Sequence, residues 1–491
     1  MSFNSAQFLI FFPIVVGLYY LIPRKMRYIW LLIASYYFYM SWNPKYVILI
    51  ATSTILTWGT ALLIEKRQSR CLLFSCIGIN LAILFLFKYF DFGIDTINRF
   101  LGKIGISLIS NPFDFLLPVG ISFFTFQAIG YIVDVYKGQT KAEHNLLKYA
   151  LFVSFFPQLV AGPIERSGNL LKQIQESQQK KVCDLYKQIT NGLIYMLYGF
   201  FLKLVIADRI AILVDHVWDE WYLYGGIELI VAMLGFALQI YCDFSSYSTI
   251  AIGAAQVMGF ELMENFNAPY FATSIKEFWR RWHISLSTWF RDYVYIPLGG
   301  NRKSKVRKYI NLMITFLLSG LWHGASWNYV VWGGIHGFYQ IMGELTSPIR
   351  KKIYPLIGIK KDTAFYRAGS MLCTFLLTSF AWIFFRSTGL HAAVSFCINI
   401  VRMWNPWVIF DGTLLSLGLS LYEWNILLVA LLVLILTDYV RVKKHMRIDQ
   451  YLEEQGAFCK ILAIIFLCVY IFIFGIYGGG YDASQFIYFQ F

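Results

Sequence analysis

Long apolar stretches fill most of the chain, and short loops rich in lysine and arginine separate them. The clearest apolar stretches are Phe8–Ile22, Tyr28–Trp42, Tyr46–Ile64, Cys71–Phe87, Leu193–Val205, Ser370–Phe385, Trp424–Thr437 and Lys460–Tyr477. A helix needs about 20 mostly apolar residues to cross the hydrocarbon core of a bilayer, so the pattern predicts an all-α polytopic membrane protein with about 10–12 transmembrane or re-entrant helices. No interval between the stretches could hold a soluble domain, so residues 1–491 are expected to form one membrane domain.

Composition and charge agree with this interpretation. Hydrophobic residues make up 58% of the chain and charged residues 14%, whereas soluble proteins have about 45–50% and about 25%. The net charge of +14 fits basic loops that set membrane topology better than it fits a nucleic-acid-binding protein. Phe8–Ile22 has no basic residue before it and no small-residue cleavage site after it, so it is interpreted as a retained first span.

Several kinds of chemistry have no motif in the sequence. The eight cysteines form no CxxC pair and lie mostly within apolar stretches, which is typical of buried free thiols rather than of disulfides or a zinc site. The chain has no GxSxG elbow, no Walker A loop and no dinucleotide-binding glycine fingerprint. We therefore expect neither a serine hydrolase nor an ATPase nor a dehydrogenase, and no bound metal or cofactor.

Two segments depart from a simple span. Asp114–Pro163 contains helix breakers in Leu117–Gly120 and Phe155–Pro163, and such backbone is tolerated at membrane depth only inside protein or along a cavity. It predicts bent or re-entrant helices that line a cavity, with ordinary loop breaks as the alternative. Glu165 and Arg166 are expected at a solvated loop end.

The second segment is Ile275–Tyr293, which is predicted to be one amphipathic helix in the plane of the membrane interface. Its apolar face carries Ile275, Phe278, Trp279, Trp282, Leu286, Trp289, Phe290 and Tyr293, and its polar face carries Lys276, Glu277, Arg280, Arg281, Ser287, Arg291 and Asp292. The basic face could bind anionic lipid headgroups, or it could receive an acidic or phosphorylated donor.

The residues best suited to chemistry follow this helix. Tyr309–Gly343 contains no Asp, Glu, Lys or Arg, and its length predicts two membrane spans with a tight break at Gly320–Ser326. His323 lies at that break, where an ionisable residue is a functional hypothesis by default. Histidine titrates near neutrality and can accept a proton from a hydroxyl. The alternative is a structural histidine that bonds a neighbouring helix.

Two further residues are candidates. His283 lies at the border of the two faces of the amphipathic helix and could meet His323. Asp243 lies in an apolar stretch, where it could orient a histidine, bind a sugar, or form a buried structural pair. His336 is interpreted as structural.

Several runs resemble a known family. Glu277–Tyr293 followed by Tyr295–Arg302 resembles the signature of the membrane-bound O-acyltransferases, and Ser319–Gly324 is similar to the block around that family's central histidine. The chain is most similar to the branch that includes the membrane protein of bacterial alginate O-acetylation. The resemblance is strongest over residues 117–336. Further matching runs are Leu117–Phe126, Asp134–Tyr136, Phe155–Pro163, Gln239–Ser248, Asn265–Tyr270 and Phe486–Phe491, with Cys242 and Ser246 as departures.

The resemblance implies a fold and an activity. It implies a ring of helices around a central tunnel, with His323 as the central histidine and general base and His283 as the second. It implies transfer of an acyl group, expected to be acetyl, from a cytoplasmic thioester such as acetyl-CoA toward an extracytoplasmic polysaccharide. Residues expected near the substrates are Asp243, Trp322, Asn301, Arg302 and Arg281.

The expected surroundings follow from the same resemblance. They are the bacterial cytoplasmic membrane, its lipids and an extracytoplasmic acetyltransferase partner, with no nucleic acid. Acyl transfer as in teichoic-acid D-alanylation, a transporter of a lipid-linked or acyl carrier, and a non-catalytic scaffold remain as alternatives.

Overall fold

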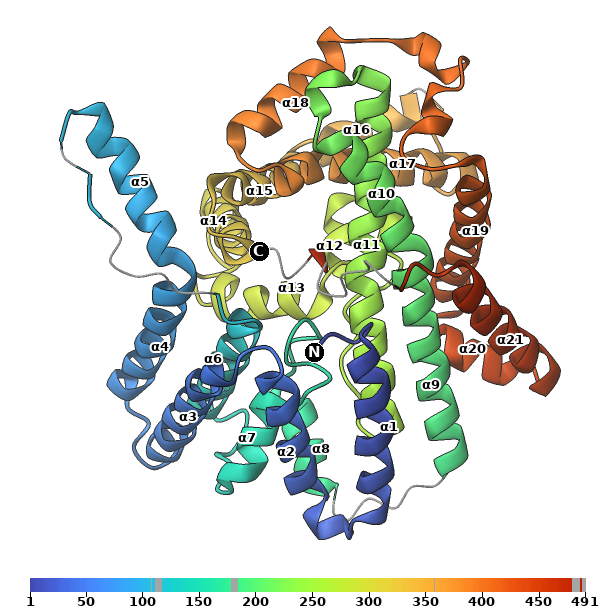
Figure 1. Ribbon diagram of the computed structural model, residues 1–491. Coiled ribbons are helices and arrows are strands. Elements are labelled where there is room, and N and C mark those ends of the chain that lie inside the picture. Colours follow the sequence, from blue (N-terminus) through green and yellow to red (C-terminus); the bar gives the residue numbers. More distant parts are fainter. Residues whose placement is uncertain (107, 111–116, 178–183, 357, 479–485, 488–491) are drawn as a thin grey trace. The chain divides into compact units, whose positions relative to one another are not determined.

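The computed structural model describes residues 1–106, 108–110, 117–177, 184–356, 358–478 and 486–487. Regular structure among these residues is helical, which confirms the all-α prediction (Figure 1). Asp114, Cys183 and the end of the terminal run, residues 488–491, lie outside the described residues. The described chain divides into two compact units, Met1–Gly192 with Ala251–Met263, and Leu193–Ile250 with Glu264–Phe491.

The first unit is built from the amino-terminal helices, and α9 and α11 contribute to both units. Its helices are α1 (Ala6–Leu21), α2 (Arg27–Met40), α3 (Val47–Arg67), α4 (Arg70–Leu84), α5 (Phe90–Lys103), α6 (Ile121–Tyr136), α7 (Leu146–Ser154), α8 (Lys172–Glu176), α9 (Leu185–Phe201) and α11 (Gly226–Val257). The π-helical segment η3 (Phe85–Tyr89) joins α4 to α5. Helices α3, α4, α6 and α7 pack against one another.

The second unit carries the candidate site. Its further helices are α10 (Asp208–Trp218), α12 (Ile275–Arg281), α13 (Ile284–Phe290), α14 (Lys305–His323), α15 (Trp327–Leu345), α16 (Ser347–Leu356), α17 (Ala364–Arg386), α18 (Leu390–Arg402), α19 (Leu421–Lys444), α20 (Ile448–Glu454) and α21 (Ala457–Phe474). Within this unit α15 packs against α14, α17 and α12.

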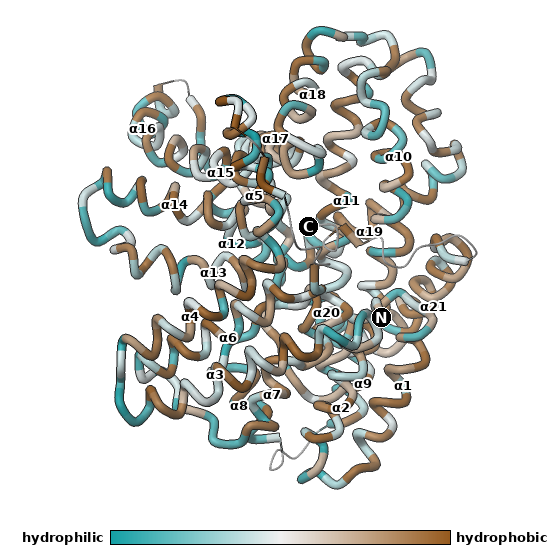
Figure 2. The backbone as a smooth tube through the Cα atoms, turned by 60° about the vertical axis from the view of Figure 1, so that its left-hand side comes forward, coloured by the Kyte–Doolittle hydropathy of each residue, from teal (hydrophilic) through white to brown (hydrophobic). Residues whose placement is uncertain are grey.

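Six helices of the described chain are long and apolar enough to cross a bilayer. They span Pro44–Arg67, Arg70–Lys103, Gly226–Val257, Ala364–Arg386, Leu421–Lys444 and Ala457–Phe474. Apolar residues follow the length of most helices in Figure 2, and polar residues gather at helix ends and loops. The chain is therefore a multi-pass membrane protein. The full number of 10–12 spans, the ring and the tunnel remain predictions.

The helix breakers in the first unit lie inside protein. Gly120 caps α6 with φ +77°, and a Cβ there would approach the Leu159 carbonyl oxygen to 2.6 Å. Residues 155–163 are non-helical and buried. The Phe152 carbonyl accepts hydrogen bonds from the Gln127 and Gln158 amides, at 2.7 Å each. Side-chain amides thus take part in the hydrogen bonding of this region, as backbone buried from water requires.

The prediction for Glu165 was wrong. Its side chain is buried, with 2% of the residue exposed, and it accepts hydrogen bonds from the Met263 N–H and the Asn169 amide. Burial raises the pKa of Glu165 to about 7. The sequence shows a polar pair after a proline, but it does not show that Met263, 98 residues later, bonds the Glu165 side chain.

The single amphipathic helix predicted for Ile275–Tyr293 was also wrong in one respect. The backbone breaks at Trp282 and His283, where His283 adopts φ +42°, so that α12 and α13 are separate short helices. The predicted division into faces nevertheless holds on both, because Phe278, Trp279 and Trp289 are buried while Lys276, Arg280 and Arg291 are exposed. The break turns His283 into the protein.

Two helices meet at His323 as predicted, although neither is among the six that are long and apolar enough to cross a bilayer, so their crossing of the membrane stays a prediction. Helix α14 ends at His323, Gly324 is its extended C-cap, and α15 begins at Trp327. The two helices run side by side in Figure 1 and pack along their lengths. A Cβ on Gly320 would come within 2.2 Å of the Tyr329 carbonyl oxygen, and one on Gly333 within 2.2 Å of the Phe316 carbonyl oxygen. Small residues thus permit the close approach of helices that is common in membranes.

Candidate functional site

His323 lies in a cluster of aromatic rings in the second unit. It is 5% exposed, and its ring centroid is 5.0 Å from that of Trp322, 5.1 Å from that of Trp332 and 5.4 Å from that of Phe385. These rings come from α14, α15 and α17. They surround the imidazole with apolar surface, which strengthens any electrostatic interaction made there.

The structure brings His283 to His323. Their ring centroids are 6.3 Å apart, and His283 is fully buried against the edge of Phe244 at 4.7 Å. Burial lowers the pKa of His283 to about 3, so this imidazole is neutral at physiological pH. The predicted meeting of the two histidines is confirmed, while their catalytic roles remain predictions.

His336 belongs to the same cluster. It is fully buried, its ring centroid is 5.0 Å from Trp332, and its Nδ1 accepts a hydrogen bond of 3.2 Å from the Trp279 indole. Trp332 therefore contacts the imidazoles of both His323 and His336. The sequence did offer a signal, since His336 is one helical turn after Trp332 within the uncharged run Tyr309–Gly343.

Asp243, for which the sequence left three roles open, forms a buried ion pair. Its Oδ1 is 2.6 Å from Lys203 Nζ, which also lies 2.8 Å from Asp208, and its Oδ2 accepts a 2.8 Å hydrogen bond from the Ile487 N–H. Lys203 lies in the π-helical segment η5 (Leu202–Ala207). The structure thus realises the buried structural pair, and a role in substrate binding remains a prediction.

The other predicted substrate residues differ in their surroundings. Trp322 is buried beside both histidines. Arg281 donates two hydrogen bonds to Glu277 and one to the Asn267 carbonyl. Asn301 is exposed and lines a cavity, whereas Arg302 is exposed and does not line that cavity.

This cavity has a volume of about 2110 Å³ and lies between α12–α13, α14–α15 and α16–α17. Six basic side chains line it together with one acidic side chain, Glu344; the basic ones are Lys276, Arg280, Arg291, Lys308, Arg350 and Lys360. Lys308 pairs with Glu344, and Arg291 pairs with Asp292. The lining therefore has an excess of positive charge and suits a ligand that carries several negative charges.

The apolar wall of the cavity approaches the histidine cluster. Ser319 lines the cavity and precedes His323 by one turn of α14. Trp279 and Phe316 line it too, and they contact each other at 5.2 Å while Trp279 bonds His336. Only one layer of rings thus lies between the cavity and His336.

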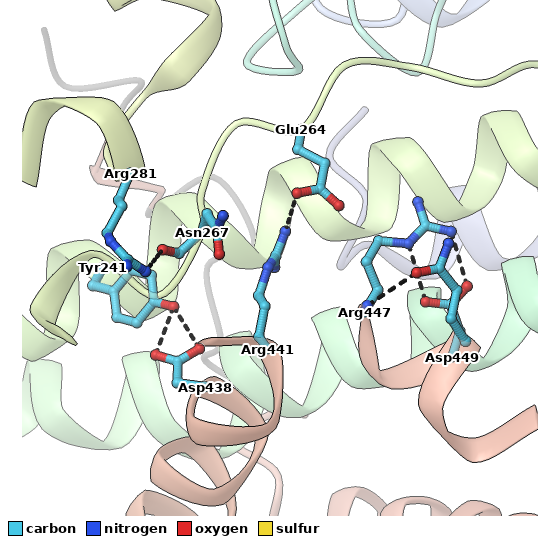
Figure 3. Close-up of polar contacts among 9 residues, drawn as sticks. Tyr241, Glu264, Asn267, Arg281, Asp438, Arg441, Arg447 and Asp449 are labelled. Carbon is cyan, nitrogen blue, oxygen red and sulfur yellow. Dashed lines mark hydrogen bonds and ion pairs between the residues drawn. The ribbon is translucent and has the colours of Figure 1, made fainter. Parts of the chain in front are cut away.

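A second set of polar contacts joins α11 and α19 to the segment before α12 (Figure 3). The Tyr241 hydroxyl bonds both oxygens of the buried Asp438, at 3.0 and 2.9 Å, and Arg441 pairs with Glu264 at 2.6 Å. Asp438 and Arg441 lie on the apolar helix α19, and neither was predicted as a site residue. Arg447 and Asp449 form a further pair, at 2.8 Å.

Two features of the described residues bear on metals and thiols. No group of three or more His, Cys, Asp or Glu side chains in that part of the chain could hold a metal ion. Seven cysteines are described there, each as a free thiol.

Comparisons with known proteins agree with one another. A model of MBOAT, the membrane-bound O-acyltransferase family, matches residues 139–385. The probable alginate O-acetylase AlgI of Pseudomonas putida is 40% identical over 411 residues, covering 80% of this chain and 79% of that protein. The peptidoglycan O-acetyltransferase of Helicobacter pylori is 35% identical over 406 residues, covering 76% and 74%. The teichoic acid D-alanyltransferase of Bacillus subtilis is 31% identical over 289 residues, covering 57% and 71%.

Proposed function

Since the chain belongs to the membrane-bound O-acyltransferase family and is a multi-pass acyltransferase, we propose that it passes an acetyl group from a cytoplasmic thioester to hydroxyls of an extracytoplasmic polysaccharide. The observation that carries this proposal is the pair His323 and His283, 6.3 Å apart in a buried aromatic cluster one helical turn from a cavity with excess positive charge. The choice of acetyl as the acyl group and of a polysaccharide as the acceptor is based on the relatives that are named as acetylating enzymes.

The reaction needs one base and two aligned substrates. A ring nitrogen of His323 takes the proton of the acceptor hydroxyl, the oxygen attacks the thioester carbonyl, and a C–O bond replaces the C–S bond. The protonated His323 then donates this proton to the departing thiolate. General-base catalysis of this kind contributes about 10²–10⁴-fold, and alignment of the two substrates contributes the rest.

The cavity suits the donor. Acetyl-CoA carries phosphates at one end and a thioester at the end of a long flexible arm, so its phosphates would lie against Lys276, Arg280 and Arg291. The arm would pass along Ser319 toward His323. Asn301 lines the same cavity. The lipid-headgroup alternative for the basic face is less well supported, because these side chains line a cavity rather than a flat surface.

The remaining parts of the proposal come from the family resemblance. We place the chain in the bacterial cytoplasmic membrane, with an extracytoplasmic acetyltransferase as a partner and the polysaccharide or a serine of that partner as the acceptor. The similarity to a teichoic acid D-alanyltransferase makes D-alanyl transfer from a carrier protein the second candidate.

A purified sample tests the proposal directly. The protein in lipid nanodiscs is given acetyl-CoA labelled in the acetyl group, with an oligosaccharide acceptor or the partner protein. An acetyltransferase releases free CoA and transfers the label. A D-alanyltransferase leaves acetyl-CoA intact but, given a labelled D-alanyl carrier protein instead, transfers the D-alanyl group and releases the carrier thiol. A transporter or scaffold leaves both thioesters intact, which would contradict the proposal.

The cavity charges give a separate prediction. Lys276→Gln with Arg280→Gln is expected to raise the KM for acetyl-CoA about 10-fold with kcat little changed, because charge-assisted hydrogen bonds to phosphate are each worth about 1.5–3 kcal/mol before solvent screening. The rise should shrink at high salt, since screening weakens the wild-type contacts. Lys66→Gln with Arg67→Gln, at the end of α3, is the matched control, with an unchanged KM expected. If the two double variants have the same KM for acetyl-CoA, the basic side chains of the cavity do not bind the donor.

A further inference from the structure

Asn265 lies at the centre of the contacts that hold His283. It is 1% exposed, in the non-helical segment that precedes α12. Its Oδ1 lies 2.9 Å from His283 Nδ1 and 2.9 Å from the Ser285 hydroxyl, which donates to it. Its Nδ2 donates to the Ser248 hydroxyl at 3.1 Å.

These contacts fix the orientation of the amide. The Ser285 backbone N–H, which can only donate, also points at Asn265 Oδ1. The atom beside His283 is therefore the carbonyl oxygen and not the NH₂ group. Because that oxygen can only accept, His283 Nδ1 must carry the proton, and in the neutral imidazole the lone pair lies on Nε2.

The backbone of this segment is held on both sides of Asn265. The Ile284 N–H donates to the Asn265 carbonyl and the Asn267 N–H to the Arg281 carbonyl, each at 2.9 Å. The segment is thus bonded to the end of α12 and to the start of α13, on either side of the left-handed residue His283. Figure 3 shows two further ties, Glu264 to Arg441 and Arg281 to the Asn267 carbonyl. Asn265 thus stands in a clamped segment that leaves its side chain little freedom.

We propose that Asn265 is a positioning residue for acyl transfer, which holds His283 in the tautomer with its lone pair on Nε2. A partner on the other ring nitrogen fixes the tautomer and ring orientation of metal-ligating histidines, and its loss costs about 10–100-fold there. We expect an effect of the same order for a histidine that acts in acyl transfer. His283 is thereby an acceptor within the cluster that contains His323. The expected effect on the rate rests on the proposed acyl transfer. The tautomer of His283 does not depend on that function.

The first measurement is independent of activity. In protein labelled with ¹⁵N-histidine, with the His283 signal assigned by its loss in His283→Gln, wild type is expected to show a protonated Nδ1 and an unprotonated Nε2. Asn265→Leu should populate both tautomers. A wild-type His283 with its proton on Nε2 would overturn the proposal, even if no acyl transfer were detected.

The second measurement uses the pH profile. Asn265→Leu is expected to lower kcat about 10–100-fold. Asn265→Asp keeps an acceptor for the Nδ1 proton and should restore much of the rate at high pH. The new carboxylate favours the imidazolium, so it raises the pKa of His283, and the acid limb of the profile should move to higher pH. Of the described rings packed against His283, those of Phe244, Phe266 and Trp322 do not titrate, and that of His323 does.

Asn80→Leu is the matched control. Asn80 is 1% exposed, belongs to the first unit, and bonds Ser53 on α3 and the Cys76 carbonyl on α4. Its loss should lower thermal stability without moving the acid limb or the His283 tautomer. The role of Asn265 is merely structural if the acid limb of the pH–rate profile of Asn265→Asp lies at the same pH as that of wild type. The same conclusion follows if Asn80→Leu shifts the acid limb as far as Asn265→Asp does.

Discussion

His323→Ala is expected to lower acetyl transfer by about 10²–10⁴-fold, the usual contribution of a general base, with the protein at its normal level in the membrane. The reason is that the reaction loses the group that takes the proton from the acceptor hydroxyl. The measurement is O-acetylation of the polysaccharide in cells, together with the rate of thioester consumption by the purified variant. KM for acetyl-CoA should change little, because His323 is one turn beyond the cavity lining.

Close packing around His323 means that the alanine variant loses stability as well as the imidazole. The rings of Trp322, Trp332 and Phe385 lie 5.0–5.4 Å from it, so alanine leaves a void that costs stability. His323→Gln fills more of that space and still forms hydrogen bonds but cannot act as a base, and it should be as inactive. His391→Ala, on an exposed position of α18, is the control and should keep wild-type activity. Near-wild-type acetylation by His323→Gln would refute the catalytic role.

The sequence predicted those parts of the site that local patterns determine. The uncharged run from Tyr309 to Gly343 and the glycines beside His323 were enough to predict the α14–α15 pair and the histidine at its end. Apolar runs predicted the helices because burial in lipid requires about 20 apolar residues in a row, wherever the rest of the chain lies.

The missing parts depend on contacts between distant residues. The break at His283 is stabilised by Asn265, which precedes it by 18 residues, and no helical pattern reveals that bond. Lys203 lies in a stretch that was interpreted only as apolar, and its partner Asp243 is 40 residues away. A lysine in such a stretch does call for a carboxylate, so these two could have been paired from the sequence.

The buried ion cluster gives the other large expected effect, on stability. Lys203→Met is expected to lower the free energy of unfolding by about 3–5 kcal/mol, as removal of one partner from a buried ion pair does. The cost is high because Asp243 and Asp208, which both contact Lys203 Nζ, are then left as like charges in one buried space. Thermal unfolding of the purified protein and its level in the membrane are the measurements.

Asp243→Asn should cost less than Lys203→Met, and this order tests the structural role of Asp243. Lys203 keeps its 2.8 Å pair with Asp208, and the asparagine oxygen can still accept the Ile487 N–H. The double variant Lys203→Met with Asp243→Asn should be more stable than Lys203→Met alone, because only one carboxylate then remains beside the site. If Asp243→Asn instead unfolds like wild type but raises the KM for the acceptor, Asp243 binds substrate.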